Sequence, residues 1–190
     1  MTNKIFALIG PHASGKSTIL HKLKEMGICI IPVYTTRVPT EADRNNTITK
    51  FLSKSAFSQK DWIVKSTYKG DYYGISKEEA LNALKNHQIS VTMMDINGLK
   101  QIRKLLNGNM ESVYIMVDYV TLVERMLRMG HTNIDMKYHL EYAENNGEFD
   151  NWKSSTHVIK NTTSPEKAIM QLMAIMGLSS APSKEILMKI

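Results

Sequence analysis

Residues 10–18 read Gly-Pro-His-Ala-Ser-Gly-Lys-Ser-Thr, and the rest of the chain is best understood around this segment. Gly10, Gly15, Lys16 and Ser17 fit the template G-x-x-x-x-G-K-[ST], which is typical of a phosphate-binding loop. Glycines allow the backbone to wrap closely, so that successive N–H groups point toward phosphate oxygens. The positive N-terminal end of the following helix strengthens that attraction. The motif therefore predicts an anion site at the start of a helix.

The residues on either side of this loop have the patterns that the motif requires. Lys4 to Ile9 is a short apolar run that predicts a buried strand, and Ser17 to Glu25 predicts a helix. In such a strand–loop–helix unit the lysine reaches the β- and γ-phosphates of ATP, and the hydroxyl at position 17 is a ligand of Mg²⁺. The residues expected to bind ATP here are Gly10, Pro11, His12, Ala13, Ser14, Gly15, Lys16, Ser17 and Thr18.

Length and composition favour one globular domain. The chain has 190 residues, of which 43% are hydrophobic and 22% charged. No apolar run approaches the roughly 20 residues of a membrane span, and the six-residue apolar stretch near the N-terminus is too short for a signal peptide. Cys29 is the only cysteine and lies in an apolar run, so we expect a buried thiol in a reducing compartment. These features predict a cytoplasmic protein.

The formal net charge of +6 raises the alternative of a nucleic-acid-binding protein. Against it, lysines and arginines are spread along the chain rather than clustered, and no recognition motif is found. An enzyme that handles phosphates also needs positive potential near its site. We therefore expect no dedicated binding of nucleic acid.

Further apolar runs alternate with helical patterns along the chain. This alternation predicts a three-layer α/β/α fold with a mostly parallel sheet, in the manner of P-loop NTPases. In such a sheet Asp95, near the carboxyl end of its strand, faces the same crevice as the phosphate loop. The expected strands are 28–33, 89–96, 112–117 and 157–159, and the expected helices are 99–106, 120–129 and 164–176.

Two stretches interrupt the alternation. Residues 34–86 are less regular and predict an inserted subdomain, in which Ser53 and Ser76 are N-caps of short helices and residues 34–39 are turn-like. Residues 130–149 are polar, with patchy helical periodicity. The tail from Gly177 is expected to be weakly ordered until residue 184.

Four further motifs follow the phosphate loop in order. Together with the loop they resemble the guanylate kinase family over roughly residues 4–176. The segments are Tyr34-Thr35-Thr36-Arg37-x-Pro39, Gly70-Asp71-Tyr72-Tyr73-Gly74, Met94-Asp95-Ile96 and Val158-Ile159-x-Asn161.

The resemblance implies an ATP- and Mg²⁺-dependent transfer of the γ-phosphoryl group to GMP, giving ADP and GDP. It also implies one domain with a core at 1–33, 87–129 and 150–178, a monophosphate-binding subdomain at 34–86, a lid at 130–149 and a tail at 179–190. The expected protein is a monomer or homodimer that acts on small nucleotides.

The same resemblance implies roles for individual side chains. Lys16, Arg37, Arg125 and Arg128 would be catalytic, with Arg37 gripping the acceptor phosphate and the other two arginines leaning over the transferring group. Asn161 would join the ATP site, and Ser17 would hold the metal ion. The expected acceptor-binding residues are Tyr34, Arg37, Tyr72, Tyr73 and Asp95.

The sequence departs from the family pattern mainly on the acceptor side. Val64 stands where a glutamate that binds guanine is expected, and Thr40 replaces a second phosphate-gripping arginine. We therefore predict weakened or altered guanine specificity. Two alternatives remain: a kinase for another phosphorylated acceptor, and a binding module without catalysis, which the retained Lys16 and Ser17 disfavour. The other departures are Thr49, Ile75, Asn97 and His139.

Overall fold

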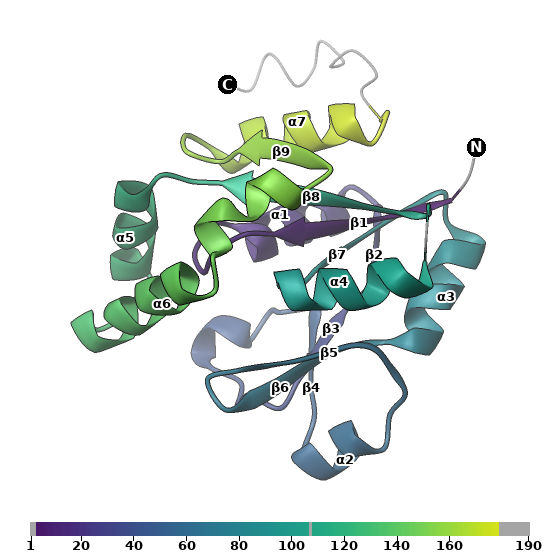
Figure 1. The fold of residues 1–190 in the computed structure, drawn as a ribbon, viewed down its shortest axis with the longest axis horizontal. Helices are drawn as coiled ribbons and strands as arrows, with labels where there is room; N and C mark the ends of the chain where they lie inside the picture. The colour runs from purple at the N-terminus through teal and green to yellow at the C-terminus, as the bar shows by residue number, and fades with distance from the viewer. Residues whose placement is uncertain (1–2, 107, 179–190) are drawn as a thin grey trace.

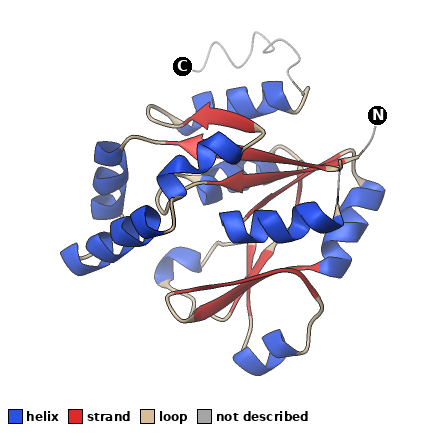
Figure 2. Cartoon of the chain, viewed as in Figure 1, coloured by secondary structure: helices blue, strands red, loops and turns tan. Residues whose placement is uncertain are grey.

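The computed structural model describes residues 3–106 and 108–178, and its centre is a five-stranded parallel sheet (Figures 1 and 2). The strand order is β2-β7-β1-β8-β9, so the strand before the phosphate loop lies in the middle. The strands are β1 (Lys4–Ile9), β2 (Cys29–Ile30), β7 (Ile89–Met93), β8 (Met110–Met116) and β9 (His157–Lys160).

Helices cover both faces of this sheet because β1 is apolar on both sides. Ile5, Ala7 and Ile9 pack with α3 and α4, whereas Phe6 and Leu8 pack with α1 and α7. All five side chains are buried, which is typical of a central parallel strand. The helices are α1 (Lys16–Glu25), α3 (Lys77–Asn86), α4 (Ile96–Leu105), α5 (Tyr119–Arg128), α6 (Asn133–Asn145) and α7 (Pro165–Ile175).

A second sheet forms the inserted subdomain, below the central sheet in Figure 1. Its order is β4-β3-β6-β5, with β3 and β4 parallel and the other pairs antiparallel. Lys69 and Gly70 both have positive φ, so they form the tight turn of the β5–β6 hairpin. The elements are β3 (Val33–Thr35), the 3₁₀ helix η1 (Glu41–Asp43), β4 (Thr49–Phe51), α2 (Lys54–Ser58), β5 (Trp62–Tyr68) and β6 (Asp71–Ser76).

The predicted three-layer architecture is confirmed, but several element bounds were wrong. The expected strand 28–33 is interrupted at Pro32, so that Cys29–Ile30 forms β2 and Val33 begins β3. Tyr34, which was expected in a turn, lies in β3. The strand expected to reach Ile96 ends at Met93, because Asp95 caps α4 by accepting from Gly98 N at 2.6 Å. Cys29 is half-buried rather than buried, as befits an edge strand.

The polar stretch after α5 is more regular than its sequence suggests. It contains the 13-residue helix α6, whose start is fixed by a capping box between Thr132 and Asp135, and then the 3₁₀ helix η2 (Glu148–Ser154). The expectation for the tail beyond residue 178 lies outside the described residues. Within the described ranges, every helix is too short or too polar to cross a bilayer.

We predict that Gly74→Ala destabilises the inserted subdomain. A Cβ at Gly74 would lie 2.7 Å from Trp62 Cε3 and 3.0 Å from Phe57 Cζ, and neither ring can yield without moving the sheet. Overpacking of this kind costs about 1–3 kcal/mol. Urea unfolding should report this loss, while Ser58→Ala, an exposed control in α2, should stay within about 0.5 kcal/mol of the parent. An unchanged Gly74→Ala midpoint would contradict the packing.

Candidate active site

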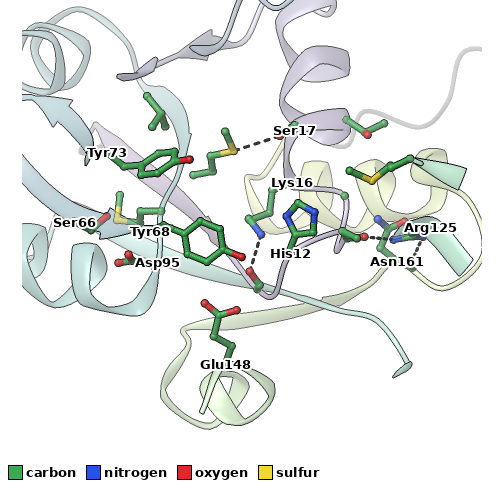
Figure 3. Close-up of a pocket in the computed structure, with 18 of the residues that line it drawn as sticks. His12, Lys16, Ser17, Ser66, Tyr68, Tyr73, Asp95, Arg125, Glu148 and Asn161 are labelled. Atoms are coloured by element: carbon green, nitrogen blue, oxygen red, sulfur yellow. Dashed lines mark hydrogen bonds between the residues drawn. The ribbon is translucent and has the colours of Figure 1, made fainter. Parts of the chain in front are cut away.

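A cavity of about 680 Å³ opens at the carboxyl edge of the central sheet, between the phosphate loop, the second sheet and α5 (Figure 3). It lies there because parallel strands deliver the segments that follow them to the same edge. Its lining comprises Gly10, His12, Ala13, Gly15, Lys16, Ser17, Thr18, Val33, Val64, Ser66, Tyr68, Tyr73, Gly74, Ile75, Met93, Met94, Asp95, Arg125, Arg128, Met129, Tyr142, Glu148, Asn161, Thr163 and Pro165.

The loop between β1 and α1 requires glycine at both ends of its turn. Gly10 and Gly15 have φ of 146° and 97°, and Ala13 also has a positive φ of 61°. A Cβ at Gly15 would lie 2.4 Å from Asn161 Nδ2, and one at Gly10 would lie 3.0 Å from the Ile115 carbonyl oxygen. The backbone therefore forms a tight anion-binding turn that side chains at these positions would prevent.

The ammonium group of Lys16 lies inside this turn. Its Nζ donates to the carbonyl oxygens of Gly10 at 2.6 Å and Pro11 at 2.8 Å. Burial lowers the pKa of Lys16 to about 8, although the carboxylates of Glu148 and Asp95 partly oppose that shift. The loop thus holds a cation whose protonation changes close to neutral pH.

Arg125 and Asn161 hold the loop from the outside. Arg125 Nη1 donates to the carbonyl oxygens of Ala13 at 3.3 Å and Ser14 at 3.2 Å, and its Nη2 donates to Asn161 O at 2.6 Å. Asn161 Nδ2 donates to Ser14 O at 2.9 Å. Burial lowers the pKa of Arg125. These contacts hold the carbonyl groups of Ala13 and Ser14 on the outer side of the loop.

Arg128 lines the same cavity, but its environment differs. It lies one turn after Arg125 on α5, is largely exposed, and pairs loosely with Glu124 at 3.7 Å. An exposed pair of this kind contributes little to stability, so Arg128 is able to move toward a ligand.

Arg37, the expected phosphate grip, is engaged by Asp43. Its two terminal nitrogens each donate to one carboxylate oxygen at 2.9 Å, and the hydroxyl and N–H of Thr40 also donate to that carboxylate at 2.8 Å. These bonds hold the pKa of Asp43 well below its ordinary value and raise the pKa of Arg37. Arg37 is outside the set of described residues that line the cavity.

The three expected acceptor tyrosines lie in different places. Tyr73 lines the cavity, and burial raises the pKa of its hydroxyl. Tyr34 is buried in the second sheet and donates to Glu79 Oε1 at 2.8 Å. Tyr72 stacks on Phe57, with their ring centroids 5.6 Å apart. Among the described residues that line the cavity, Tyr73 is the only one of these three tyrosines.

Two carboxylates face the loop lysine across the cavity. Asp95 was expected there; Glu148, at the start of η2, was missed (Figure 3). Burial raises the pKa of Glu148, while the nearby ammonium of Lys16 opposes that shift. Glu148 is in a polar stretch with no motif around it, so its position is set by the fold and carries no local sequence signal.

The wall opposite the phosphate loop is mainly apolar. Val64 is only 3% exposed and lines the cavity at the place where the resemblance led us to expect a glutamate. Ser66 and Tyr68 supply polar atoms further along β5. The rest of this wall consists of Val33, Ile75, Met93 and Met94.

Comparison of the sequence and the fold with known proteins points to the same kind of site. The family model described as guanylate kinase matches residues 2–177. The chain belongs to the guanylate kinase family. ATP-dependent phosphorylation of GMP is the function of that family, so the enzyme class expected from the motifs, a nucleoside monophosphate kinase, is confirmed.

Individual members of the guanylate kinase family are distant relatives. The chain is 28% identical to a guanylate kinase of Bartonella henselae over 83% of this chain and 73% of that protein. It is 31% identical to a guanylate kinase of Wolinella succinogenes over 74% of this chain and 70% of that protein. A crystal structure of guanylate kinase from Anaplasma phagocytophilum superposes with a TM-score of 0.70 at 18% identity, covering 93% of this chain and 85% of that one.

We predict that the affinity for ATP falls as pH rises above about 8. The pKa of Lys16 in the free protein is about 8, and above it the loop loses the cation that attracts the phosphates. The Kd should then approach a tenfold increase per pH unit. Titration calorimetry from pH 7 to 9.5 measures this, and Lys16→Met should remove the dependence. Lys22→Ala, on the exposed face of α1, should retain it; a parent Kd that is flat over this range would contradict the assignment.

We also predict that Asp43 contributes to the acid sensitivity of the fold. Because its pKa is lower in the folded than in the unfolded state, its stabilisation is complete above about pH 4 and is lost as pH falls further. Urea unfolding at pH 7 and pH 3 should show a smaller acid loss for Asp43→Asn than for the parent. Equal losses would mean that the Arg37–Asp43 pair is not formed in solution.

Proposed function

We propose that this protein transfers the γ-phosphoryl group of ATP to the phosphate of GMP or of a related nucleoside monophosphate. The observation that carries the proposal is a single cavity with Lys16 and the phosphate loop at one end and Tyr73 and Asp95 at the other. One cavity of this kind brings donor and acceptor phosphates together, as an in-line transfer requires.

The donor side would bind ATP through the loop amides and the N-terminus of α1. Lys16 would exchange its bonds to Gly10 O and Pro11 O for phosphate oxygens, a stronger charge-assisted contact. Arg125 would act by positioning the loop, since its donors are already engaged with loop carbonyl groups. Arg128, which is exposed and weakly paired, would neutralise charge on the transferring group.

Oxygen donors suited to Mg²⁺ lie beside this loop. Ser17 Oγ makes a weak contact to Met93 Sδ at 3.7 Å, and Asp95 lines the same cavity. Mg²⁺ prefers a few such oxygens together with phosphate and water, so Ser17 would be a direct ligand and Asp95 would hold a bound water. When bound, the ion would neutralise charge that develops on the phosphates.

On the acceptor side, Tyr73 would hydrogen-bond the monophosphate and Arg37 would grip it. Arg37 must first exchange Asp43 for the acceptor phosphate, because both ligands use the same guanidinium nitrogens. We infer that Asp43 keeps Arg37 ordered at the mouth of the site and gives it up on closure of the inserted subdomain.

The apolar wall around Val64 favours a second candidate within the same reaction class, a kinase with relaxed or altered acceptor choice. A buried site that hydrogen-bonds a base rejects other bases by orders of magnitude, and an apolar side chain supplies no such bond. The protein would act in the cytoplasm as a monomer or homodimer, and these two points remain predictions.

An acceptor screen tests the reaction and its selectivity together. We predict ADP release with Mg²⁺ and ATP only when an acceptor is added, with kcat/KM values for GMP, dGMP, AMP, CMP and UMP within about 100-fold of one another. A micromolar KM for GMP with the other four inactive would refute altered selectivity. ADP release without any acceptor would refute the transferase.

The role of Arg37 is tested by Arg37→Ala. Loss of a charge-assisted phosphate contact should lower kcat/KM for the acceptor by about 10- to 100-fold, with a higher KM and a lower kcat, while ATP affinity stays nearly constant. Arg44→Ala, an exposed arginine at the end of η1, is the matched control and should leave both unchanged. A loss of ATP affinity in Arg37→Ala would reverse the assignment of donor and acceptor sides.

A further inference from the structure

Three histidines meet where residues 130–149 contact the phosphate loop. One ring nitrogen of each of His12, His131 and His139 lies within 4.8 Å of the other two. The Nε2 atoms of His12 and His131 are 3.1 Å apart, and the rings of His12 and His139 stack with centroids 3.8 Å apart. His12 belongs to the loop, whereas the other two come from a segment more than 110 residues later.

We propose that His12, His131 and His139 form a binding site for a transition-metal cation of the Zn²⁺ type, which ties α6 to the phosphate loop. Three imidazoles with one open position are a ligand set that Zn²⁺ accepts. Tetrahedral bonds of about 2.0–2.1 Å place two ligand nitrogens about 3.3 Å apart, close to the separation of the His12 and His131 nitrogens. The ring of His139 would rotate out of its stack to complete the set.

The backbone around the cluster orients two of the three rings. Gly130, with φ 78°, ends α5, and His131 N bonds back to Met126 O at 3.1 Å, which fixes where His131 leaves the helix. His139 lies on the buried face of α6 together with Met136 and Ala143. The site therefore combines one residue on a helix face, one that directly follows a helix end and one from the phosphate loop.

His139 has an orphaned nitrogen that a cation would use. The ring is 5% exposed, Nδ1 is hydrogen-bonded to the hydroxyl of Tyr68, and Nε2 is buried with no partner among the described residues. A metal-binding histidine usually donates its other N–H to an oxygen outside the metal's own ligands, and Tyr68 supplies that oxygen. A hydrogen bond between His12 and His131 alone would leave His139 Nε2 unsatisfied.

The charged groups around the three histidines affect which fourth ligand the cation would take. Lys69 lies near His139 and is paired with Asp135 at 3.2 Å, and Lys16 lies near His12. Both are cationic, so an anionic or polarised fourth ligand such as water, hydroxide or a phosphate oxygen is favoured over a further neutral donor. Of the three histidines, His12 also lines the main cavity.

Titration of the full chain with ZnCl₂, without nucleotide or Mg²⁺, tests the site. We expect one Zn²⁺ per chain and at least a tenfold loss of affinity in His131→Ala. His131 lies between α5 and α6 and is partly exposed, so the fold does not depend on its ring; circular dichroism checks this. His87→Ala, an exposed histidine after α3, is the matched control and should bind like the parent. No binding, or equal binding by His131→Ala, would overturn the proposal.

Two further measurements distinguish this site from loose surface binding. Co²⁺ in place of Zn²⁺ should give the intense visible absorption of a tetrahedral complex, and the weak spectrum of an octahedral ion would overturn the proposal. Tyr68→Phe removes the oxygen partner of His139 and should weaken Zn²⁺ binding by about 10- to 100-fold. Unchanged affinity in Tyr68→Phe would contradict the arrangement of His139 described above.

Discussion

The conformation of one turn, between the central strand β1 and helix α1, is the constraint on which the rest of the structure depends. It needs glycine at positions 10 and 15, because both residues have positive φ and a side chain at either position would collide with its neighbours. Its carbonyl groups are held by Lys16 from within and by Arg125 from outside. The backbone N–H groups of this turn and of the start of α1 are the donors that we expect phosphate to use, and the cavity that they border lies at the same edge of the sheet.

The inserted subdomain lines the same cavity as this turn, but with a different set of side chains. Arg37 pairs with Asp43 inside the subdomain, and Tyr34 donates to Glu79 of α3, so both side chains already have protein partners. Its polar atoms at the cavity come from Ser66, Tyr68 and Tyr73, and the wall around Val64 is apolar. The side of the cavity formed by the phosphate loop and α5 therefore carries cations, whereas the wall around Val64 is apolar, which is why we predict altered selectivity for the acceptor.

Features set by neighbouring residues could be predicted from the sequence, and features set by distant ones could not. The phosphate loop, the caps at Ser53 and Ser76 and the alternation of strands and helices are local patterns, and all are present. The place of Glu148 and the meeting of His12 with His131 depend on the folded chain. His12 and His131 are 119 residues apart, and the polar stretch that contains His131 shows no periodicity strong enough to predict α6.

We expect the backbone N–H groups that residues 10–18 possess, all except that of Pro11, to bind the phosphates of a nucleoside triphosphate. Hydrogen–deuterium exchange of the full chain with Mg²⁺ and a non-hydrolysable ATP analogue measures this directly, amide by amide. We predict slower exchange throughout this turn and the first turn of α1 when the analogue is added. Unchanged exchange there, with protection appearing elsewhere in the chain, would contradict it.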